Sequence, residues 1–180
     1  DIMVVSKQLT SSYMPLAAIL FTEALYNGIA DNTSRIGTWG HGYTTTGHPV
    51  ATAVGLENIK IIEERDLVGH AARVGSLLQQ RLRDLSSHPL VGDVRGVGLM
   101  AAVEMTPDKA VRTGFRQPGR AGARAFAAAL ENQLIVRVIG DTVAFCPPLI
   151  INEQQVDDLV NRFSRVLDET EAFVRQEGLR

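Results

Sequence analysis

Lys7 directly follows a short apolar segment, and its position is the first feature of this sequence that could do chemistry. Residues 2–5 contain three β-branched side chains, a composition that predicts a buried strand. Lys7 would then lie at the carboxyl end of that strand, the edge where open α/β sheets bind ligands. An amine at such an edge can act as a nucleophile. The alternative is a solvated lysine at the end of a strand.

A loop rich in hydroxyl groups, residues 41–48, precedes a candidate helix that starts at Pro49 and continues to about Arg65. Proline is common in the first turn of a helix, where its missing N–H is not needed. We expect Ala53, Leu56 and Ile59 on the apolar face of this helix, with Ile62 one turn later. The free N–H groups and partial positive charge of a helix N-terminus would hold an anion such as phosphate. The alternative is that Thr46 or a neighbour only caps the helix.

Arg137 lies within an otherwise apolar segment, residues 134–138, which is typical of a strand. A buried arginine requires a partner, and its planar guanidinium group suits a carboxylate. Asp141 and Glu104 are candidate structural partners, and a substrate carboxylate is the other possibility. Arg95 is a similar case, but its glycine neighbours favour a structural turn.

These residues need two sets of elements to position them. Residues 1–65 are predicted to form part of a mostly parallel sheet with crossover helices, including a second buried strand at residues 16–21 and a long loop at residues 31–47. Residues 66–180 read as a small α+β domain in which helices alternate with strand pairs. Its last helix is predicted to start at Asn152, with Gln155 completing a capping box.

Composition excludes several classes of partner. The chain has 180 residues, a net charge of -2 and 21% charged residues, so we expect neither nucleic acid nor a membrane as partner. The single cysteine, Cys146, is typical of a reducing compartment and we expect a cytoplasmic protein. The chain starts at Asp1 within what reads as an interior strand, so we interpret it as the C-terminal part of a longer polypeptide.

Four segments together resemble a known family. They are VVSKQLTSSYMPLAAIL, HGYTTTGHPVATAVGLENIKIIEE, VRGVGLMAAVE and LIVRVIGDTVAFCPPLII, in this order. The sequence resembles the C-terminal half of class III aminotransferases, above all the ω-amino acid:pyruvate and amine:pyruvate transaminases. The resemblance implies the α/β fold type I of enzymes dependent on pyridoxal phosphate (PLP). Residues 1–65 would end the large mixed-sheet domain, and residues 66–180 would form the small α+β domain.

The resemblance also implies a role for three residues. Lys7 matches the catalytic lysine that binds PLP covalently and shuttles a proton, a role that requires a neutral amine. Thr44 matches the threonine that reaches the cofactor phosphate of the other subunit, which implies a homodimer with a shared active site, or a tetramer built from it. Arg137 matches the mobile arginine that binds the carboxylate of an amino or keto acid. No metal ion is expected.

The implied reaction moves an amino group from an ω-amino acid or amine to pyruvate or a similar keto acid by a ping-pong mechanism. The family's phosphate-binding loop, ring-stacking aromatic residue and ring-nitrogen aspartate lie upstream of the family lysine, and none can be located in this chain. Thr45 and Thr46 stand where relatives often carry an aromatic or small residue followed by serine. Alternatives are an ornithine-type aminotransferase, a glutamate-semialdehyde aminomutase, a dialkylglycine decarboxylase, or a fragment without catalytic activity in which Lys7 and Arg137 only form salt bridges.

Overall fold

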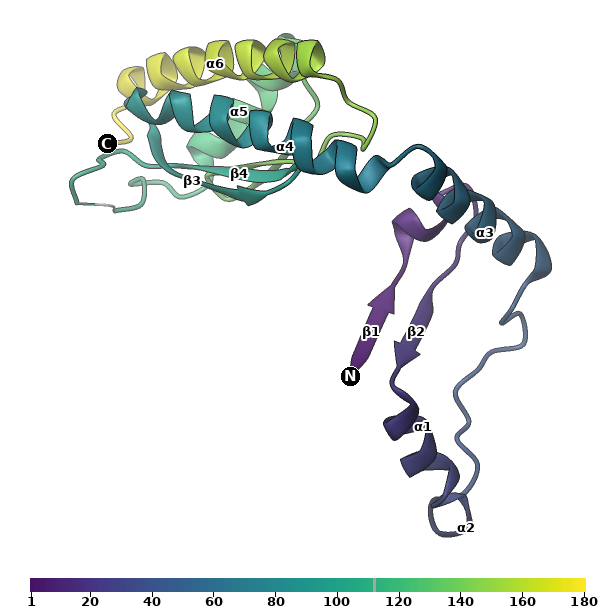
Figure 1. Ribbon diagram of the computed structural model, residues 1–180. Coiled ribbons are helices and arrows are strands. Elements are labelled where there is room, and N and C mark those ends of the chain that lie inside the picture. Colours follow the sequence, from purple (N-terminus) through teal and green to yellow (C-terminus); the bar gives the residue numbers. More distant parts are fainter. Residues whose placement is uncertain (112) are drawn as a thin grey trace. The chain divides into compact units, whose positions relative to one another are not determined.

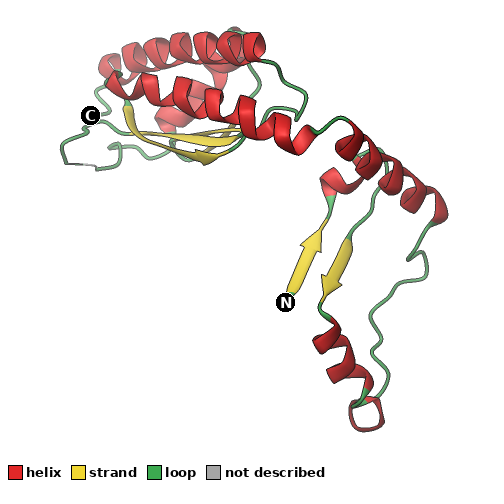
Figure 2. Cartoon of the chain, in the orientation of Figure 1, coloured by secondary structure: helices red, strands yellow, loops and turns green. Residues whose placement is uncertain are grey.

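The computed structural model describes residues 1–111 and 113–180, which form two compact units, Asp1–Asp66 and Leu67–Arg180 (Figure 1). Each unit is described by itself. Helices dominate the chain, and its strands are short (Figure 2). Among the described residues, no helix combines the length and the apolar character needed to cross a membrane.

The first unit begins with two strands, β1 (Ile2–Val5) and β2 (Ala18–Phe21), which pair antiparallel. The sequence predicted a mostly parallel sheet here. The strands run antiparallel because the connection contains only the 3-10 helix η1 (Lys7–Thr10), whereas a parallel pair needs a longer crossover, usually an α-helix. The prediction of buried strands was also wrong for this chain, since Ile2 and Val4 are 65% and 67% exposed.

Three helices complete the first unit: α1 (Glu23–Ala30), α2 (Thr33–Ile36) and α3 (Pro49–Glu64). Helix α2 lies inside the segment predicted as a long loop. Helix α3 starts at Pro49, as predicted.

The apolar face predicted for α3 is not the buried one. Leu56 is 70% exposed and Ile59 is 40% exposed, whereas Ala51 and Gly55 are buried. These small residues let α3 approach η1 closely, because a Cβ atom added at Gly55 would lie 3.7 Å from the Leu9 carbonyl oxygen and 3.8 Å from Thr10 Cγ2. Close packing against the turn after β1 therefore decides which face of α3 is buried.

The second unit is an antiparallel sheet with three long helices on one face (Figure 1). The strand order is β3-β4-β6-β5. The elements in chain order are α4 (Leu67–Asp84), η2 (Leu85–Ser87), β3 (Val91–Val97), β4 (Met100–Met105), α5 (Arg120–Glu131), β5 (Arg137–Ile139), β6 (Thr142–Phe145) and α6 (Glu153–Gln176). This arrangement is the α+β domain that the sequence predicted.

The core of this unit lies between the sheet and its helices. Val74, Leu78 and Leu82 of α4 are buried and form the apolar stripe by which that helix packs into the core. The predicted capping box at the start of α6 is also confirmed: Asn152 Oδ1 accepts from the Gln155 N–H at 2.9 Å, and Gln155 Oε1 accepts from the Asn152 N–H at 3.0 Å.

Strand alternation sorts the sheet residues onto two faces. Residues paired across neighbouring strands share a face. One row across the sheet packs into the core and consists of Val94, Val103, Val143 and Val138. The next row along the strands faces away from the helices and consists of Arg95, Ala102, Ala144 and Arg137. We call the side of the sheet that bears this second row the open face.

The hairpin between β3 and β4 is tied to α4. Gln79 Nε2 donates to the carbonyls of Gly98 and Met100, both at 2.9 Å. A Cβ atom added at Gly75 would lie 2.4 Å from the carbonyl carbon of Gly98. Only glycine at position 75 permits this approach, which holds the hairpin that carries Arg95.

Candidate active site

Lys7 is the first residue of η1 and follows β1 after one residue, at the strand exit where the sequence predicted it. Its backbone has a φ of 52°, and Ser11 and Ser12 have φ values of 47° and 64°. Left-handed backbone at a residue other than glycine is uncommon and costs roughly 1 to 3 kcal/mol. Such strained residues cluster at functional sites when the surrounding structure holds them in place.

The side chain of Asn58 on α3 holds this strained turn. Its Nδ2 donates to the carbonyls of Gln8 at 2.8 Å and Leu9 at 3.3 Å, and its Oδ1 accepts from Ser11 Oγ at 2.8 Å. Thr10, which is 1% exposed, donates from Oγ1 to the Met14 carbonyl. The turn is therefore fixed by side chains from two elements.

Sequence reasoning missed Asn58. The available signal was its spacing from Ala51 and Gly55, since residues four and then three apart share one face of a helix. A polar side chain on the same face as two small residues indicates a side chain that binds a neighbouring backbone.

The Lys7 amine itself is left available. Lys7 is exposed, and within the described part of the chain its side chain takes part in no hydrogen bond or ion pair. A lysine that only closed a salt bridge would have a carboxylate partner. An amine without a partner, at a rigid strand exit, is suited to covalent bonding with an aldehyde.

Thr44 lies at the tip of a turn before α3. The turn is closed at both ends, because the Tyr43 N–H donates to Thr46 Oγ1 at 2.6 Å and the Thr46 N–H donates to the Tyr43 carbonyl at 3.0 Å. Thr46 therefore bonds within the turn and does not cap the helix. The alternative interpretation, in which Thr46 is the cap, is wrong. The N-cap residue is His48, which makes no side-chain capping bond.

Four ring side chains of the first unit form a continuous series that leads to this turn. The Phe21 and Trp39 ring centroids are 5.3 Å apart, those of Trp39 and His41 are 5.5 Å apart, and those of His41 and Tyr43 are 6.4 Å apart. The series joins the end of β2 to the Thr44 turn. It explains how a loop without regular hydrogen bonding is positioned.

Arg137 is the first residue of β5, the strand at one edge of the sheet in the second unit, and it is exposed. The sequence placed it inside a strand of residues 134–138, where it would have been buried. In the structure, Leu134 and Val136 supply the buried side chains and precede the strand. Arg137 therefore incurs no cost of burial.

Both structural partners predicted for Arg137 are bound elsewhere. Asp141 accepts from the N–H groups of Gly119 and Gly122 at the start of α5, each at 2.8 Å. Glu104 accepts from Arg95 Nη1 at 2.7 Å. Within the described residues the Arg137 side chain takes part in no hydrogen bond or ion pair.

Arg95 lies within β3 and not in a turn. Its Nη1 contacts both Asp93 Oδ2 and Glu104 Oε2 at 2.7 Å. The hydrogen bond to Asp93, followed by that to Glu104, raises the pKa of Arg95 above its ordinary value. The prediction of a turn at Arg95 was therefore wrong: Arg95 pairs with two acids on the sheet, and the turn lies at Gly98 and Leu99.

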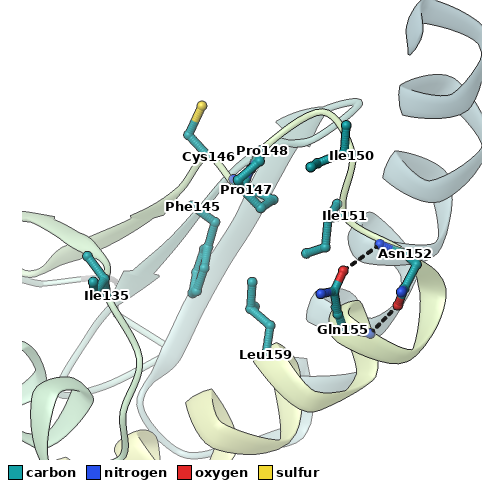
Figure 3. Close-up of a pocket in the computed structure, with 10 residues that line it drawn as sticks. All are labelled: Ile135, Phe145, Cys146, Pro147, Pro148, Ile150, Ile151, Asn152, Gln155 and Leu159. Carbon is teal, nitrogen blue, oxygen red and sulfur yellow. Dashed lines mark hydrogen bonds between the residues drawn. The ribbon is translucent and has the colours of Figure 1, made fainter. Parts of the chain in front are cut away.

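The second unit also contains an apolar cavity of about 660 Å³ beside β6 (Figure 3). Phe145, Leu159 and Ile151 line it. At its rim, the side-chain oxygens of Asn152 and Gln155 each accept from the backbone N–H of the other residue. Arg137 does not line this cavity; it borders a separate hollow of about 570 Å³ with Phe126 and Val138. The cavity of Figure 3 is thus separate from the candidate carboxylate site.

The three residues predicted for the site divide between the units. Lys7 and Thr44 belong to the first unit, and no hydrogen bond or ion pair links them within its described residues. Arg137 belongs to the second unit.

Comparisons with known proteins agree with the predicted family. The model of the family aminotransferase class-III matches residues 1–167. The diaminobutyrate–2-oxoglutarate transaminase of Halomonas elongata is 39% identical over 99% of this chain and 39% of its own length. The putrescine–pyruvate aminotransferase of Pseudomonas aeruginosa is 38% identical over 97% of this chain and 37% of its own length. The chain spans about two fifths of the length of these relatives.

Solved structures agree as well. The ω-transaminase of Pseudomonas jessenii in complex with PMP is 53% identical, with a TM-score of 0.91 over 97% of this chain and 38% of that chain. A transaminase solved with L-ala is 53% identical, with a TM-score of 0.92 over 97% of this chain and 41% of that chain. The fold is that of PLP-dependent enzymes of fold type I, which confirms the predicted fold class.

The chain belongs to the class III aminotransferases. The resemblance stated from its four sequence segments is thereby confirmed. The roles of Lys7, Thr44 and Arg137 stay predictions.

The Asn58 contacts lead to a test of how the Lys7 turn is held. In an Asn58→Ala variant, loss of the contacts to Gln8, Leu9 and Ser11 should speed amide hydrogen exchange at Ser11 and Ser12 by about a hundredfold, since each of the three hydrogen bonds contributes about 1 kcal/mol. Exchange measured by mass spectrometry on the intact protein checks this.

Lys60→Ala is the matched control, because Lys60 lies on the same helix and makes only exposed ion pairs with Glu57 and Glu64. Its exchange at Ser11 and Ser12 should equal that of the wild type. Unchanged protection in Asn58→Ala would contradict the account of the turn.

Proposed function

We propose that this chain supplies the catalytic lysine and the carboxylate-binding arginine of a PLP-dependent transaminase. The reaction would move an amino group from an ω-amino acid or amine to pyruvate or a similar keto acid in a ping-pong cycle. The observation that carries the proposal is the exposed Lys7 amine, unpaired among the described residues, on a strained turn at a strand exit. The putrescine–pyruvate relative supports pyruvate as acceptor.

The residues present fit PLP in two respects. Class III aminotransferases use this cofactor, and it needs a lysine amine for its aldehyde and polar groups for its phosphate. Lys7 offers the amine, and the Thr44 turn offers an exposed hydroxyl beside a helix N-terminus. When bound, PLP supplies the electron sink that carries the amino group between the two substrates.

Lys7 has two tasks in this proposal. Its Nζ holds the cofactor when no substrate is bound, and it then moves a proton from the substrate carbon that bears the amine. Both tasks require a fixed starting point for a flexible side chain, because proton transfer needs donor and acceptor within hydrogen-bond distance. The Asn58 contacts to the turn provide that starting point.

Thr44 is proposed to bind the cofactor phosphate of a second copy of the chain. Its exposed position on a closed turn, without a link to Lys7 of its own unit, supports a role across an interface. The proposal therefore includes a homodimer with a shared active site. A tetramer built from such dimers and a cytoplasmic location stay predictions.

Arg137 is proposed to bind the substrate carboxylate. Its guanidinium group can form two parallel hydrogen bonds to a carboxylate, and such charge-assisted pairs are stronger than neutral ones. The engagement of Asp141 and Glu104 by other groups supports this role. A side chain free to move can also withdraw when the substrate is an amine without a carboxylate.

A second candidate acceptor is 2-oxoglutarate. The diaminobutyrate–2-oxoglutarate relative supports it, at an identity close to that of the pyruvate-dependent relative. Both acceptors carry the carboxylate that Arg137 would bind. Comparing pyruvate and 2-oxoglutarate as acceptors for the same amine distinguishes them.

The role of Lys7 can be tested by trapping the cofactor. In the intact enzyme, borohydride reduction after addition of PLP should attach the cofactor to the peptide that contains Lys7, with loss of the visible absorbance. Peptide mass spectrometry checks the site of attachment. Lys7→Ala should show neither attachment nor transamination, whereas Lys60→Ala, an exposed lysine on α3, should behave as the wild type. A Lys7→Ala enzyme that transaminates would refute the assignment.

The role of Arg137 can be tested by steady-state kinetics. Arg137→Ala should raise KM for pyruvate about tenfold to a hundredfold, the range expected for loss of a charge-assisted hydrogen bond of about 1.5 to 3 kcal/mol. KM for an amine without a carboxylate should change much less. Steady-state kinetics with each substrate varied in turn measure both. Arg83→Ala removes an exposed arginine from α4 of the same unit and serves as the control. Equal effects on KM for both substrates in Arg137→Ala would count against binding of the substrate carboxylate by Arg137.

A further inference from the structure

Arg95 and Arg137 lie at the same level of one sheet, on its two opposite edges. The register pairs Arg95 with Ala102, Ala102 with Ala144, and Ala144 with Arg137. All four side chains therefore belong to the open face. Only the two alanines lie between the arginines in this row, so no long side chain separates them.

Glu104 lies on the same face, one row away. Its pairing partner on β6 is Thr142, which in turn pairs with Ile139 on β5. Two strand spacings of ~4.8 Å and one two-residue step of ~6.7 Å put the Cα atoms of Glu104 and Arg137 ~12 Å apart. Extended glutamate and arginine side chains can span that separation across Ala144 and Thr142.

Arg95 forms an ion pair with Glu104, the carboxylate that could otherwise bind Arg137. Its Nη1 lies 2.7 Å from Glu104 Oε2 and 2.7 Å from Asp93 Oδ2, so one guanidinium neutralises two acids of the open face. Without Arg95, Glu104 would be a half-exposed carboxylate within reach of an arginine that is unpaired among the described residues. The two opposite charges would then attract each other.

We propose that Arg95 is a positioning residue for recognition of the substrate carboxylate. By holding Glu104, it keeps Arg137 available for the carboxylate of the amino or keto acid. This inference rests on the proposed role of Arg137. It also assigns a reason for the three charges, Asp93, Arg95 and Glu104, that adjoin the alanine row.

Three variants of the intact, PLP-loaded enzyme test the proposal. Arg95→Met frees Glu104, and it should raise KM for pyruvate about twofold to fivefold, the factor expected when a partly exposed ion pair competes for Arg137. KM for isopropylamine, which has no carboxylate, should not change. Glu104→Gln alone should match the wild type, because it removes the competitor and leaves the Arg95 pair with Asp93.

The double variant Arg95→Met/Glu104→Gln separates positioning from folding. It also lacks Arg95, but it has no competing carboxylate at position 104, so KM for pyruvate should return to the wild-type value. A double variant as impaired as Arg95→Met would overturn the proposal and indicate a structural role for Arg95. An unchanged KM in Arg95→Met would overturn it as well.

Crystal structures provide a readout that does not depend on activity. In Arg95→Met, a Glu104 carboxylate oxygen should lie within about 4 Å of the Arg137 guanidinium nitrogens; a Glu104 side chain that points into solvent would contradict the inference. If the wild-type enzyme itself did not transaminate, the proposed function would be refuted instead. The two failures are therefore distinguishable.

Discussion

The contacts of one asparagine with a strained turn are what the proposed chemistry depends on. Asn58 binds the backbone of Gln8 and Leu9 and the hydroxyl of Ser11, and the turn it holds contains three residues with positive φ. The packing of Gly55 and Ala51 brings helix α3 close enough for these bonds to form. Because the turn starts at Lys7, the orientation of the amine follows from a helix that begins more than forty residues later in the chain.

In the second unit, the Arg137 side chain has no hydrogen-bond or ion-pair partner among the described residues. Arg137 lies on an exposed edge strand, the two nearby acids are held by the α5 N-terminus and by Arg95, and valines fix the opposite side of the sheet in the core. A buried arginine would need a permanent partner. An exposed one can exchange partners, which a site that accepts both carboxylates and plain amines requires.

The sequence predicted the family, the fold class, the start of α3 and the α6 capping box, because these depend on local patterns or on motifs in a fixed order. It did not predict which face of α3 is buried, since that depends on the close approach of Gly55 to another segment. It predicted parallel pairing and burial for the first strands, which the short connection and the uncovered faces do not produce. The sequence offered Asp141 and Glu104 as candidate partners of Arg137, because it does not reveal that the α5 N-terminus and Arg95 already bind them.

The central claim is that the Lys7 amine and a second copy's Thr44 hydroxyl meet at one cofactor. A crystal structure of the intact enzyme with PLP tests it most directly. The account predicts Lys7 Nζ bonded to the cofactor and Thr44 Oγ1 of a second copy within hydrogen-bond distance of its phosphate. A structure in which Lys7 points into solvent away from the cofactor, with no Thr44 at the phosphate, would contradict it.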